Sequence, residues 1–508
     1  MKNLVAITLL TVLTTGSAFA GTRDNDDTCD VKVGPAATLL LPYFEVDLQN
    51  PAGRTTLFTI TNVSRLSQIA HVTVWTDWSF PVLDFNIFLT GYDVQGISLR
   101  QVLVQGIVAQ NNGTGPTTAQ SPLGSLSAGF TANPNFAGGG ASINCAKQPG
   151  QINLTLLAAV RSALTTGIYN TGGSLTCATP VGGVHANAIG YVTIDVASNC
   201  SLLMPTDPTY YTSSILFDNV LIGDYQQLGP QPAETSAPGP FDAAGNPMVH
   251  IRAVPEGGPA GGDLVATGLP YTFYDRYTPA TNRTADRRQP LPSTFAARFI
   301  EGGTSSFATN LTIWRESLGV GSCADVQSNR VMNVAEILRF DEHENVYTLA
   351  PCTSLCISPQ PTLLPAASST DTSSGIGGFL SSADVGGWLY MNLNNGGSTA
   401  YSVTHDLGGV RTVITGLGSK SDLAPLGSGT IGPRPSQNWV TATIFGSLGA
   451  NRLSTEFDAA SLGNGCSPAV ASGAAIGPAG GMPVCPSGDL GCVPGVAPFT
   501  GTNVNPPP

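Results

Sequence analysis

Charged side chains are scarce in this sequence, because Asp, Glu, Lys and Arg together make up only 11% of its 508 residues. Surface helices need a charged or polar face, so this scarcity disfavours a fold built from long amphipathic helices. Glycine and proline are plentiful instead, at 60 and 38 residues, which is typical of many turns that join short strands. The composition therefore predicts an all-β protein.

Basic residues are few as well: 21 Lys and Arg stand against 33 Asp and Glu, and the formal net charge is −12. An acidic chain is a poor partner for nucleic acid or for an anionic membrane surface, so neither is expected as a ligand. The sequence also has no run of about 18 consecutive apolar residues. No integral membrane segment is therefore expected.

The common catalytic signatures are missing too. The sequence contains no G-x-S-x-G nucleophile elbow, no H-E-x-x-H zinc motif and no P-loop. One formal G-x-G-x-x-G runs from Gly427 to Gly432, but Pro433 and Pro435 follow it where a dinucleotide-binding fold needs a helix. We predict no catalytic residue and no cofactor-binding residue, which favours a non-catalytic protein over an enzyme.

The first twenty residues have the pattern of an export signal. Lys2 precedes an apolar run from Leu4 to Leu13, and small residues at Ala18 and Ala20 complete an A-x-A cleavage site. Cleavage after Ala20 predicts a mature protein that is secreted to the periplasm, the cell surface or the medium.

Cysteines occur ten times in the expected mature chain, and an even number behind an export signal predicts disulfides. Metal ligation is the competing role, but no C-x-x-C pair or neighbouring histidine completes a tetrahedral zinc set. The pairing cannot be deduced from the sequence. The disulfide candidates are Cys29, Cys145, Cys177, Cys200, Cys323, Cys352, Cys356, Cys466, Cys485 and Cys492.

Apolar and polar residues alternate in many short segments, as in strands with one buried face. One helix is expected, from Leu154 to Leu164, with Gly167 after its end. The expected strands are Thr56–Val63, Ala70–Trp78, Phe85–Leu89, Ile97–Val104, Tyr191–Val196, Trp388–Leu393 and Trp439–Phe445. The pattern predicts antiparallel β-sandwich-like units joined by long loops rich in glycine and proline.

Composition also suggests where these units begin and end. The segment 229–247 carries five prolines and almost no large apolar residue, so it is the expected linker between two β-sandwich-like domains at 21–228 and 248–466. Residues 467–508 consist largely of Gly, Ala, Pro and Val and are expected to form a disordered, low-complexity tail. A similarity between HVTVWTDW at 71–78 and NLTIWRES at 310–317 hints at an internal duplication.

The segment LDFNIFLTGYDVQ, Leu83 to Gln95, resembles a block in a loose group of uncharacterised exported bacterial β-rich proteins that share an LDFN-x-x-L-[ST]-x-YDV pattern. LFDNVLIGDYQ at 216–226 and DRRQPLPSTFAARFIEGG at 286–303 look like further shared blocks of that group. The resemblance implies export and a β-rich structure. It implies no activity, cofactor or catalytic residue.

Two acidic clusters are the candidate metal sites. In RFDEHENV, Asp341, His343 and Glu344 are the candidate ligands for a divalent cation, and the competing interpretation is a solvated loop. Asp24 to Asp30 has an oxygen-rich composition that suits Ca²⁺, but it lacks the glycine and distal glutamate of an EF-hand. A calcium ion is the only cofactor that the sequence suggests.

The segment Trp75 to Gln95 is the candidate carbohydrate site. Its aspartates Asp77, Asp84 and Asp93, together with Trp75, Trp78 and Tyr92, are the residue types that a glycosidase uses. The competing interpretation is structural, with aromatic side chains in a core and Asp84 and Asp93 fixing turns.

Two functional classes remain after these considerations. We expect a non-catalytic surface, matrix or periplasmic protein whose partner is a protein or a polysaccharide, and the alternative is a carbohydrate-binding module or carbohydrate-active enzyme. A binding protein would have a shallow aromatic face without converging acids, whereas an enzyme would have a cleft that contains two carboxylates.

Overall fold

A computed structural model of the chain describes residues 31–108, 152–172, 176–199, 203–207, 209–229, 244–253, 272–274, 277, 286–292, 294–301, 307–317, 322–330, 332–333, 336–343, 346–348, 363–364, 366–371, 385–393, 402–407, 410–415, 437–448 and 451–461. The expected export signal, the Asp24–Asp30 segment, residues 230–243 of the expected linker and the C-terminal tail lie outside these residues.

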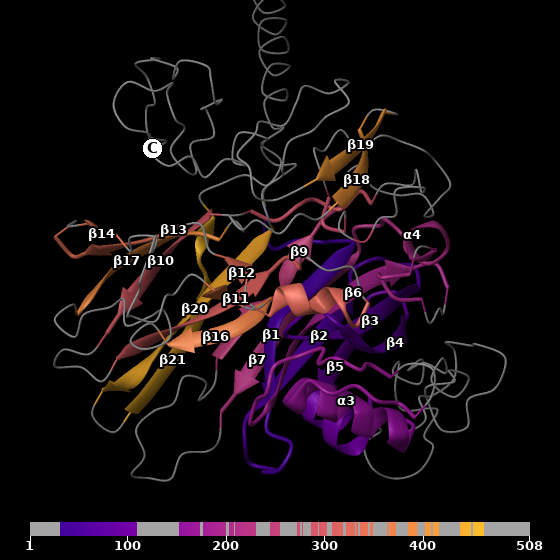
Figure 1. Cartoon of the computed structure of the whole chain (residues 1–508), viewed down its shortest axis with the longest axis horizontal. Coiled ribbons are helices and arrows are strands. Elements are labelled where there is room, and N and C mark those ends of the chain that lie inside the picture. Colours follow the sequence, from indigo (N-terminus) through magenta and orange to yellow (C-terminus); the bar gives the residue numbers. More distant parts are fainter. Residues whose placement is uncertain are drawn as a thin grey trace, which may run out of the picture.

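Two antiparallel sheets form the first half of the molecule, drawn in indigo and magenta in Figure 1, with strand orders β4-β3-β6-β1-β9 and β5-β2-β7-β8. The strands are β1 (Thr38–Val46), β2 (Thr55–Asn62), β3 (Gln68–Thr76), β4 (Pro81–Leu89), β5 (Val94–Ser98), β6 (Ala188–Ala197), β7 (Leu221–Leu228), β8 (Ala244–Pro247) and β9 (Val249–Ile251).

Two further antiparallel sheets form the second half, with orders β14-β13-β17-β10-β22 and β16-β11-β20-β21. Their strands are β10 (Thr294–Ile300), β11 (Ala308–Arg315), β13 (Glu336–Asp341), β14 (Val346–Thr348), β16 (Ala367–Asp371), β17 (Gly386–Asn392), β20 (Asn438–Leu448), β21 (Asn451–Asp458) and β22 (Ala460–Ser461). Two small sheets pair β12 (Met332–Asn333) with β15 (Leu363–Leu364) and β18 (Ser402–Leu407) with β19 (Val410–Thr415).

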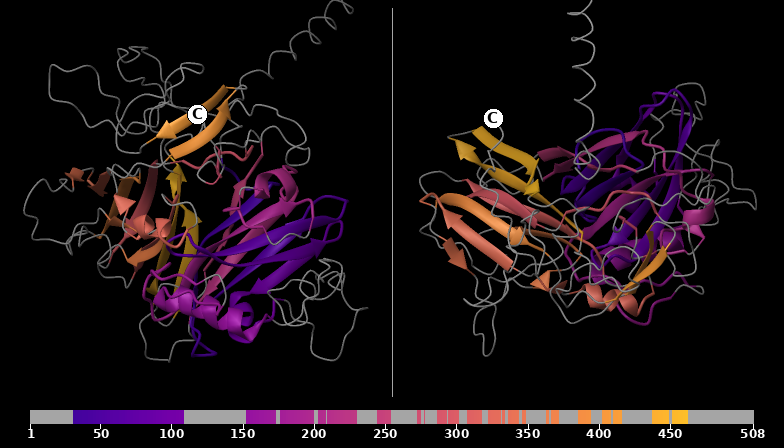
Figure 2. Two further views of the ribbon diagram at one scale, coloured as in Figure 1. Left: turned by 45° about the vertical axis from the view of Figure 1, so that its right-hand side comes forward. Right: turned by 90° about the horizontal axis from the view of Figure 1, so that it is seen from above.

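The two pairs of sheets lie side by side (Figure 2), and all strand pairs in them are antiparallel. The predicted all-β, sandwich-like class is therefore confirmed. Residues 244–251, where we expected the linker to end and the second domain to begin, form β8 and β9 and pair with β7 and β1 of the first half.

The sheet that contains β3 is buried on both faces, whereas its alternating sequence predicted one buried face. On one face, Val72 and Val74 pack into a core shared with the other sheet of the first half. On the opposite face, Trp75 and Tyr191 pack into a second core that includes Leu311 and Trp314 of the second half. The polar-looking face of β3 is thus the surface on which the second half packs.

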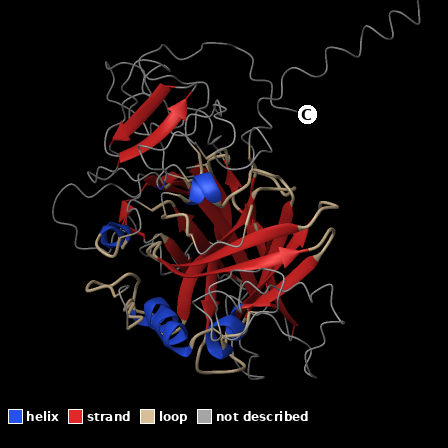
Figure 3. Cartoon of the chain, turned by 90° about the vertical axis from the view of Figure 1, so that its right-hand side faces the viewer, coloured by secondary structure: helices blue, strands red, loops and turns tan. Residues whose placement is uncertain are grey.

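The expected helix is present as α3 (Leu154–Thr166), at the periphery of the strands in Figure 3. The Asn153 side chain accepts a hydrogen bond from the backbone N–H of Thr155, and Gly167 ends the helix at φ 72°, a conformation in which glycine is favoured. Within the described ranges there are also three short helices, η2 (Gln101–Gln105), α4 (Tyr210–Ser213) and η5 (Asp325–Asn329). The strand expected at Ile97–Val104 is wrong beyond Ser98, because η2 follows there.

A fully buried ionic cluster lies where the two halves meet. The Arg288 guanidinium lies 3.0 Å from Asp286 Oδ1 and 3.4 Å from Asp195 Oδ1, and none of these side chains is exposed. Tyr210 and Tyr274 donate their hydroxyls to Asp195 Oδ2 at 2.6 and 2.9 Å. Burial, reinforced by the Asp195 charge, holds the pKa of both tyrosines well above the usual range. The two tyrosines therefore stay neutral, and the neighbouring carboxylates raise the pKa of Arg288, which stays a cation.

Polar contacts also join the edges of the two halves. Tyr225 on β7 donates its hydroxyl to Glu456 Oε1 on β21 at 2.5 Å. Asn246 on β8 donates to Asp458 Oδ1 at 2.8 Å. These hydrogen bonds connect positions more than 200 residues apart in the sequence, 231 and 212, and extend the interface beyond its apolar core.

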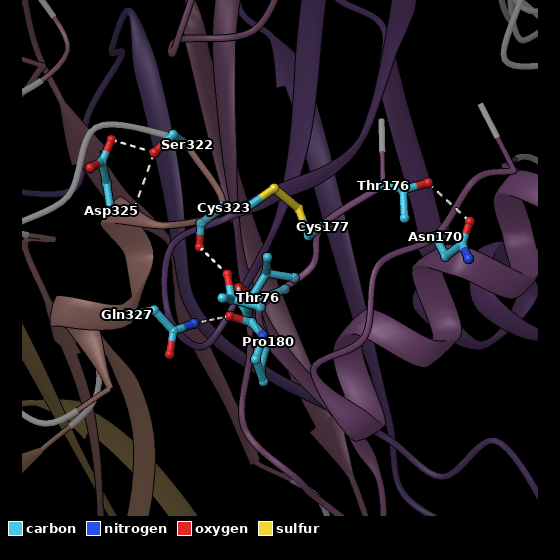
Figure 4. The surroundings of a disulfide bond; sticks show 11 residues. Thr76, Asn170, Thr176, Cys177, Pro180, Ser322, Cys323, Asp325 and Gln327 are labelled. Atoms are coloured by element: carbon cyan, nitrogen blue, oxygen red, sulfur yellow. Dashed lines mark hydrogen bonds between the residues drawn. A yellow bond between two sulfur atoms is a disulfide. The ribbon is translucent and has the colours of Figure 1, made fainter. Parts of the chain in front are cut away.

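One disulfide, between Cys177 and Cys323, connects the halves covalently (Figure 4). Thr179 donates its hydroxyl to the Cys323 carbonyl at 3.0 Å, and Gln327 donates its side-chain amide to the Pro180 carbonyl beside the disulfide. The expected disulfide bonding is confirmed for these two cysteines. The other eight candidates lie outside the described residues.

Among the described residues, no helix is long and apolar enough to cross a membrane.

Candidate functional site

The tryptophans of the Trp75–Gln95 segment are buried. Trp75 has no exposed surface and stacks on Tyr191, with ring centroids 5.6 Å apart and planes 3° from parallel. Its indole N–H donates to Thr193 Oγ1 at 2.8 Å. Trp78 is only 7% exposed. Neither ring can stack on a sugar without unfolding the surrounding structure.

The three aspartates of this segment have separate environments. Asp84 lies within β4 opposite Thr73 of β3, so the expectation that it fixes a turn is wrong. Burial raises the pKa of its carboxyl to about 7. Asp93 does fix a turn, because its carboxylate accepts hydrogen bonds from the backbone N–H and the hydroxyl of Thr90 at 3.1 and 3.0 Å. Asp77 lies apart from both of these residues, beside His185.

Asp77 pairs with a histidine that the sequence did not connect with it. Its Oδ2 lies 3.0 Å from His185 Nε2, and its Oδ1 accepts from the Gly183 N–H at 2.9 Å. The aspartate side chain is 3% exposed and the imidazole 27% exposed. A buried carboxylate thus orients a half-buried imidazole, which is an arrangement suited to proton transfer.

Gly183 makes this pairing possible. A Cβ at that position would lie 2.5 Å from His185 Nε2 and 2.8 Å from Asp77 Oδ2, closer than a real Cβ can come to either atom. The Gly182-Gly183 pair, which Val184 separates from His185, is therefore a sequence signal for close packing at this point. This signal could have pointed to the loop but not to the aspartate, which lies 108 residues earlier.

A cavity of about 460 Å³ borders His185. It lies beside α3 and is lined by Leu48, Gln49, Val104, Arg161, Ser162, Thr165, Thr166, His185 and Ala186. The Arg161 guanidinium donates to the carbonyls of Leu103 and Val104, and burial lowers its pKa. Ser162 Oγ and Thr166 Oγ1 lie 3.0 Å apart. The lining thus holds one imidazole and no carboxylate.

A second hollow, of about 450 Å³, lies over the outward face of β5, β2 and β7. It forms above Gly96, where a Cβ would meet no atom within 4 Å. Asp224 is the one carboxylate in its lining and accepts a hydrogen bond from the Thr59 hydroxyl at 2.7 Å. Neither hollow therefore has the two facing carboxylates of a glycosidase cleft.

The described part of the metal candidate, Asp341 to His343, ends β13 and begins the turn that follows it. Asp341 Oδ1 accepts the backbone N–H of His343 at 2.8 Å, and Glu342 pairs with Arg298 at 2.8 Å. Glu344 and the Asp24–Asp30 segment lie outside the described residues. Within the part of the chain that is described, no three His, Cys, Asp or Glu side chains lie close enough to hold a metal ion.

Aromatic side chains gather on the outward face of β10, β17 and β13. The inward residues Phe299, Leu389 and Ile337 pack into the second core, so alternation turns Arg298, Trp388 and Phe340 outward, and these three lie opposite one another across the strands. Trp388 is 45% exposed. The Arg298 guanidinium lies 5.7 Å from the Trp388 ring centroid.

Tyr390 lies two residues beyond Trp388 on the same side of β17 and is half-buried, as is Phe340. We call Arg298, Phe340, Trp388 and Tyr390 the outer aromatic face. The sheet that carries it lies at the outer left of the molecule in Figure 1. The sequence predicted the strand Trp388–Leu393. It did not predict that Arg298 and Phe340 lie beside Trp388, because strands distant in the sequence pair there.

Comparisons with known proteins give no family and no relative. No protein-family model matches this chain, and no curated protein matches its sequence. The resemblance of Leu83–Gln95 to exported bacterial proteins therefore stays a prediction.

Proposed function

We propose that the mature chain is an exported, non-catalytic structural or interaction protein of a cell surface, extracellular matrix or periplasm. The signal-like N-terminus and the Cys177–Cys323 disulfide support export, because disulfides persist in oxidising compartments. The acidic net charge of −12 supports a partner other than nucleic acid. The partner is then a protein or a polysaccharide.

The observation that carries this proposal is that the segment Trp75–Gln95, which has the residue types of a glycosidase site, is buried in the fold. Trp75 and Trp78 fill the core, and Asp84 and Asp93 lie within a strand and a turn. These buried residues lie within the packed fold rather than facing a cleft. A chain that uses such residues for packing fits a scaffold better than an enzyme.

The test is export followed by a search for turnover. The full chain, expressed in a bacterium, should yield a mature N-terminus at Gly21 in the periplasm or medium. The purified mature protein should release neither reducing sugar from neutral and anionic polysaccharides nor nitrophenol from nitrophenyl glycosides and esters. Retention of the full chain in the cytoplasm, or turnover that survives repurification, would contradict the proposal.

The second candidate function is a carbohydrate-active or other hydrolytic enzyme, and the Asp77–His185 pair beside its cavity favours it. There, His185 would transfer the proton and Asp77 would hold the imidazole in place. Any turnover found should then fall by at least about 100-fold in His185→Gln. The exposed-residue variant Leu66→Ala serves as the control, and equal turnover in both variants would exclude this site.

A further inference from the structure

The outer aromatic face differs from the other exposed apolar positions of the described residues. Large exposed apolar side chains such as Leu66, Leu154 and Val184 lie outside strands, and Val94 and Leu453 lie on the edge strands β5 and β21. Trp388 instead lies at the centre of three paired strands, flanked in register by Phe340 and Arg298. Neighbouring strands are about 4.8 Å apart, so these side chains form one continuous platform.

The platform is electrically balanced. Its cation, Arg298, is paired with Glu342 Oε1 at 2.8 Å while it lies over the Trp388 ring. The chain as a whole carries a net charge of −12, which repels polyanions. A neutral ligand therefore fits this face better than nucleic acid, an acidic polysaccharide or an anionic lipid surface.

The exposed area indicates how large the ligand contact is. A tryptophan presents up to about 250 Å², so the 45% exposed ring of Trp388 offers roughly 100 Å². Phe340 and Tyr390 are half-buried and add less each. The sum is well below the roughly 800 Å² per partner of a stable protein interface. It suits a narrow ligand that contacts a few rings.

A pyranose ring combines these properties, because its flat C–H faces are apolar and its rim carries hydroxyls. The faces pack on aromatic rings, and the hydroxyls bond to side chains at the edge of the platform, where Arg298 and Glu342 present donors and acceptors. We propose that the outer aromatic face binds a neutral polysaccharide, with Trp388 as the central contact. This inference rests on the proposed non-catalytic function and specifies its partner.

The experiment is retention of the disulfide-bonded mature protein on suspended microcrystalline cellulose, chitin and starch granules, with alginate gel as the polyanionic comparison. Retention is expected on at least one neutral polymer and not on alginate. Trp388→Ala should weaken it about tenfold or more, and Trp388→Phe, which keeps a ring, should restore most of it. Leu66→Ala is the control, because Leu66 is a 64% exposed apolar residue of the first half and lies in none of the candidate sites.

Four outcomes would overturn the inference. They are no retention on any neutral polymer, retention on alginate alone, equal retention of Trp388→Ala and wild type, and a Trp388-dependent dimer by sedimentation, which would assign the face to a second copy. Reducing ends are measured in the same suspensions. Release of reducing ends would refute the non-catalytic function, whether or not Trp388 contributes to binding. Failure of the proposed function is therefore distinguishable from failure of the binding inference.

Discussion

Glu456 is a buried acid whose protonation should make the stability of the protein depend on pH. It is 7% exposed, and burial raises the pKa of its carboxyl to about 7, although hydrogen bonds from Tyr225 and Thr441 oppose this shift. The unfolded chain ionises near pH 4.5. Between these two pH values the unfolded state releases a proton that the folded state retains, so a rising pH favours unfolding.

We expect Glu456 to lower the free energy of unfolding by roughly 3 kcal/mol between about pH 4.5 and pH 7. Glu456→Gln keeps an oxygen acceptor for Tyr225 and cannot ionise, so it should lose less stability over this range. Asp84, whose pKa is also raised to about 7 by burial, leaves a residual dependence of the same sign. Urea unfolding at pH 5 and pH 8 gives the free energy of unfolding of the wild type and of Glu456→Gln. Equal losses of stability in the two proteins would show that Glu456 ionises freely in the fold.

Phe85 provides the test of whether the Trp75–Gln95 segment is structural. It has no exposed surface and belongs to the first core. We expect Phe85→Ala to cost about 3 to 5 kcal/mol, whereas Tyr92→Ala at an exposed position should change stability by less than about 0.5 kcal/mol. Chemical denaturation compares the unfolding midpoints of Phe85→Ala and Tyr92→Ala. Similar midpoints for the two variants would mean that the segment contributes little to the core.

Individual strands could be predicted well, because alternation is a local property of the sequence. Phe85, Ile87 and Leu89 were expected to form an inward stripe, and all three are buried. The burial of both faces of β3 could not be predicted, since the second half that covers one face is distant in the sequence. The Asp77–His185 pair was missed for the same reason: a lone histidine gives no information about a partner 108 residues away.

Gly183 connects a loop to this pair. Because an added Cβ would lie 2.5 Å from His185 Nε2, we expect Gly183→Ala to displace the imidazole and to cost about 1 to 3 kcal/mol. Gly34→Ala is the control, since no atom lies within 4 Å of its added Cβ. Denaturation midpoints and the imidazole proton resonances in NMR spectra provide the two measurements. Unchanged resonances in Gly183→Ala would show that the loop adapts without disturbing the pair.

The two halves share one core, and this governs the behaviour of the whole molecule. Composition predicted a division near residues 229–247, yet Trp75 and Tyr191 from the first half pack in the same cluster as Trp314 from the second. Separate folding of either half would expose this cluster and leave Arg288 apart from Asp195. Amino-acid composition reflects local turn content. It does not reveal a packed interface between segments that are distant in the sequence.

We expect the mature protein to unfold in a single cooperative transition, because the two halves share the second core and neither can unfold without exposing it. The measurement is calorimetry of the disulfide-bonded protein. Tryptophan fluorescence and far-ultraviolet circular dichroism follow the unfolding in parallel. Two resolved transitions, or midpoints that differ between the two probes, would indicate that the halves fold independently.

The disulfide adds to this cohesion. Cys177 and Cys323 are separated by 146 positions, so the crosslink restricts the unfolded chain strongly. Replacing both residues with alanine should cost about 2 to 5 kcal/mol. The measurement is the urea midpoint of the double variant against that of the wild type, and an unchanged midpoint would show that the packed interface alone determines stability.

The same crosslink has a consequence for the fate of the protein in a protease-rich environment. The backbone from Cys177 to Cys323, together with the sulfur bridge, is a covalent ring, and the proline-rich segment before β8 lies inside it. A single cut opens that ring but leaves one molecule, heavier by one water, whose two pieces stay joined through the disulfide. Nicked protein would therefore migrate as one band without reductant and as two bands with it, and the molecule could be cleaved there without losing either half.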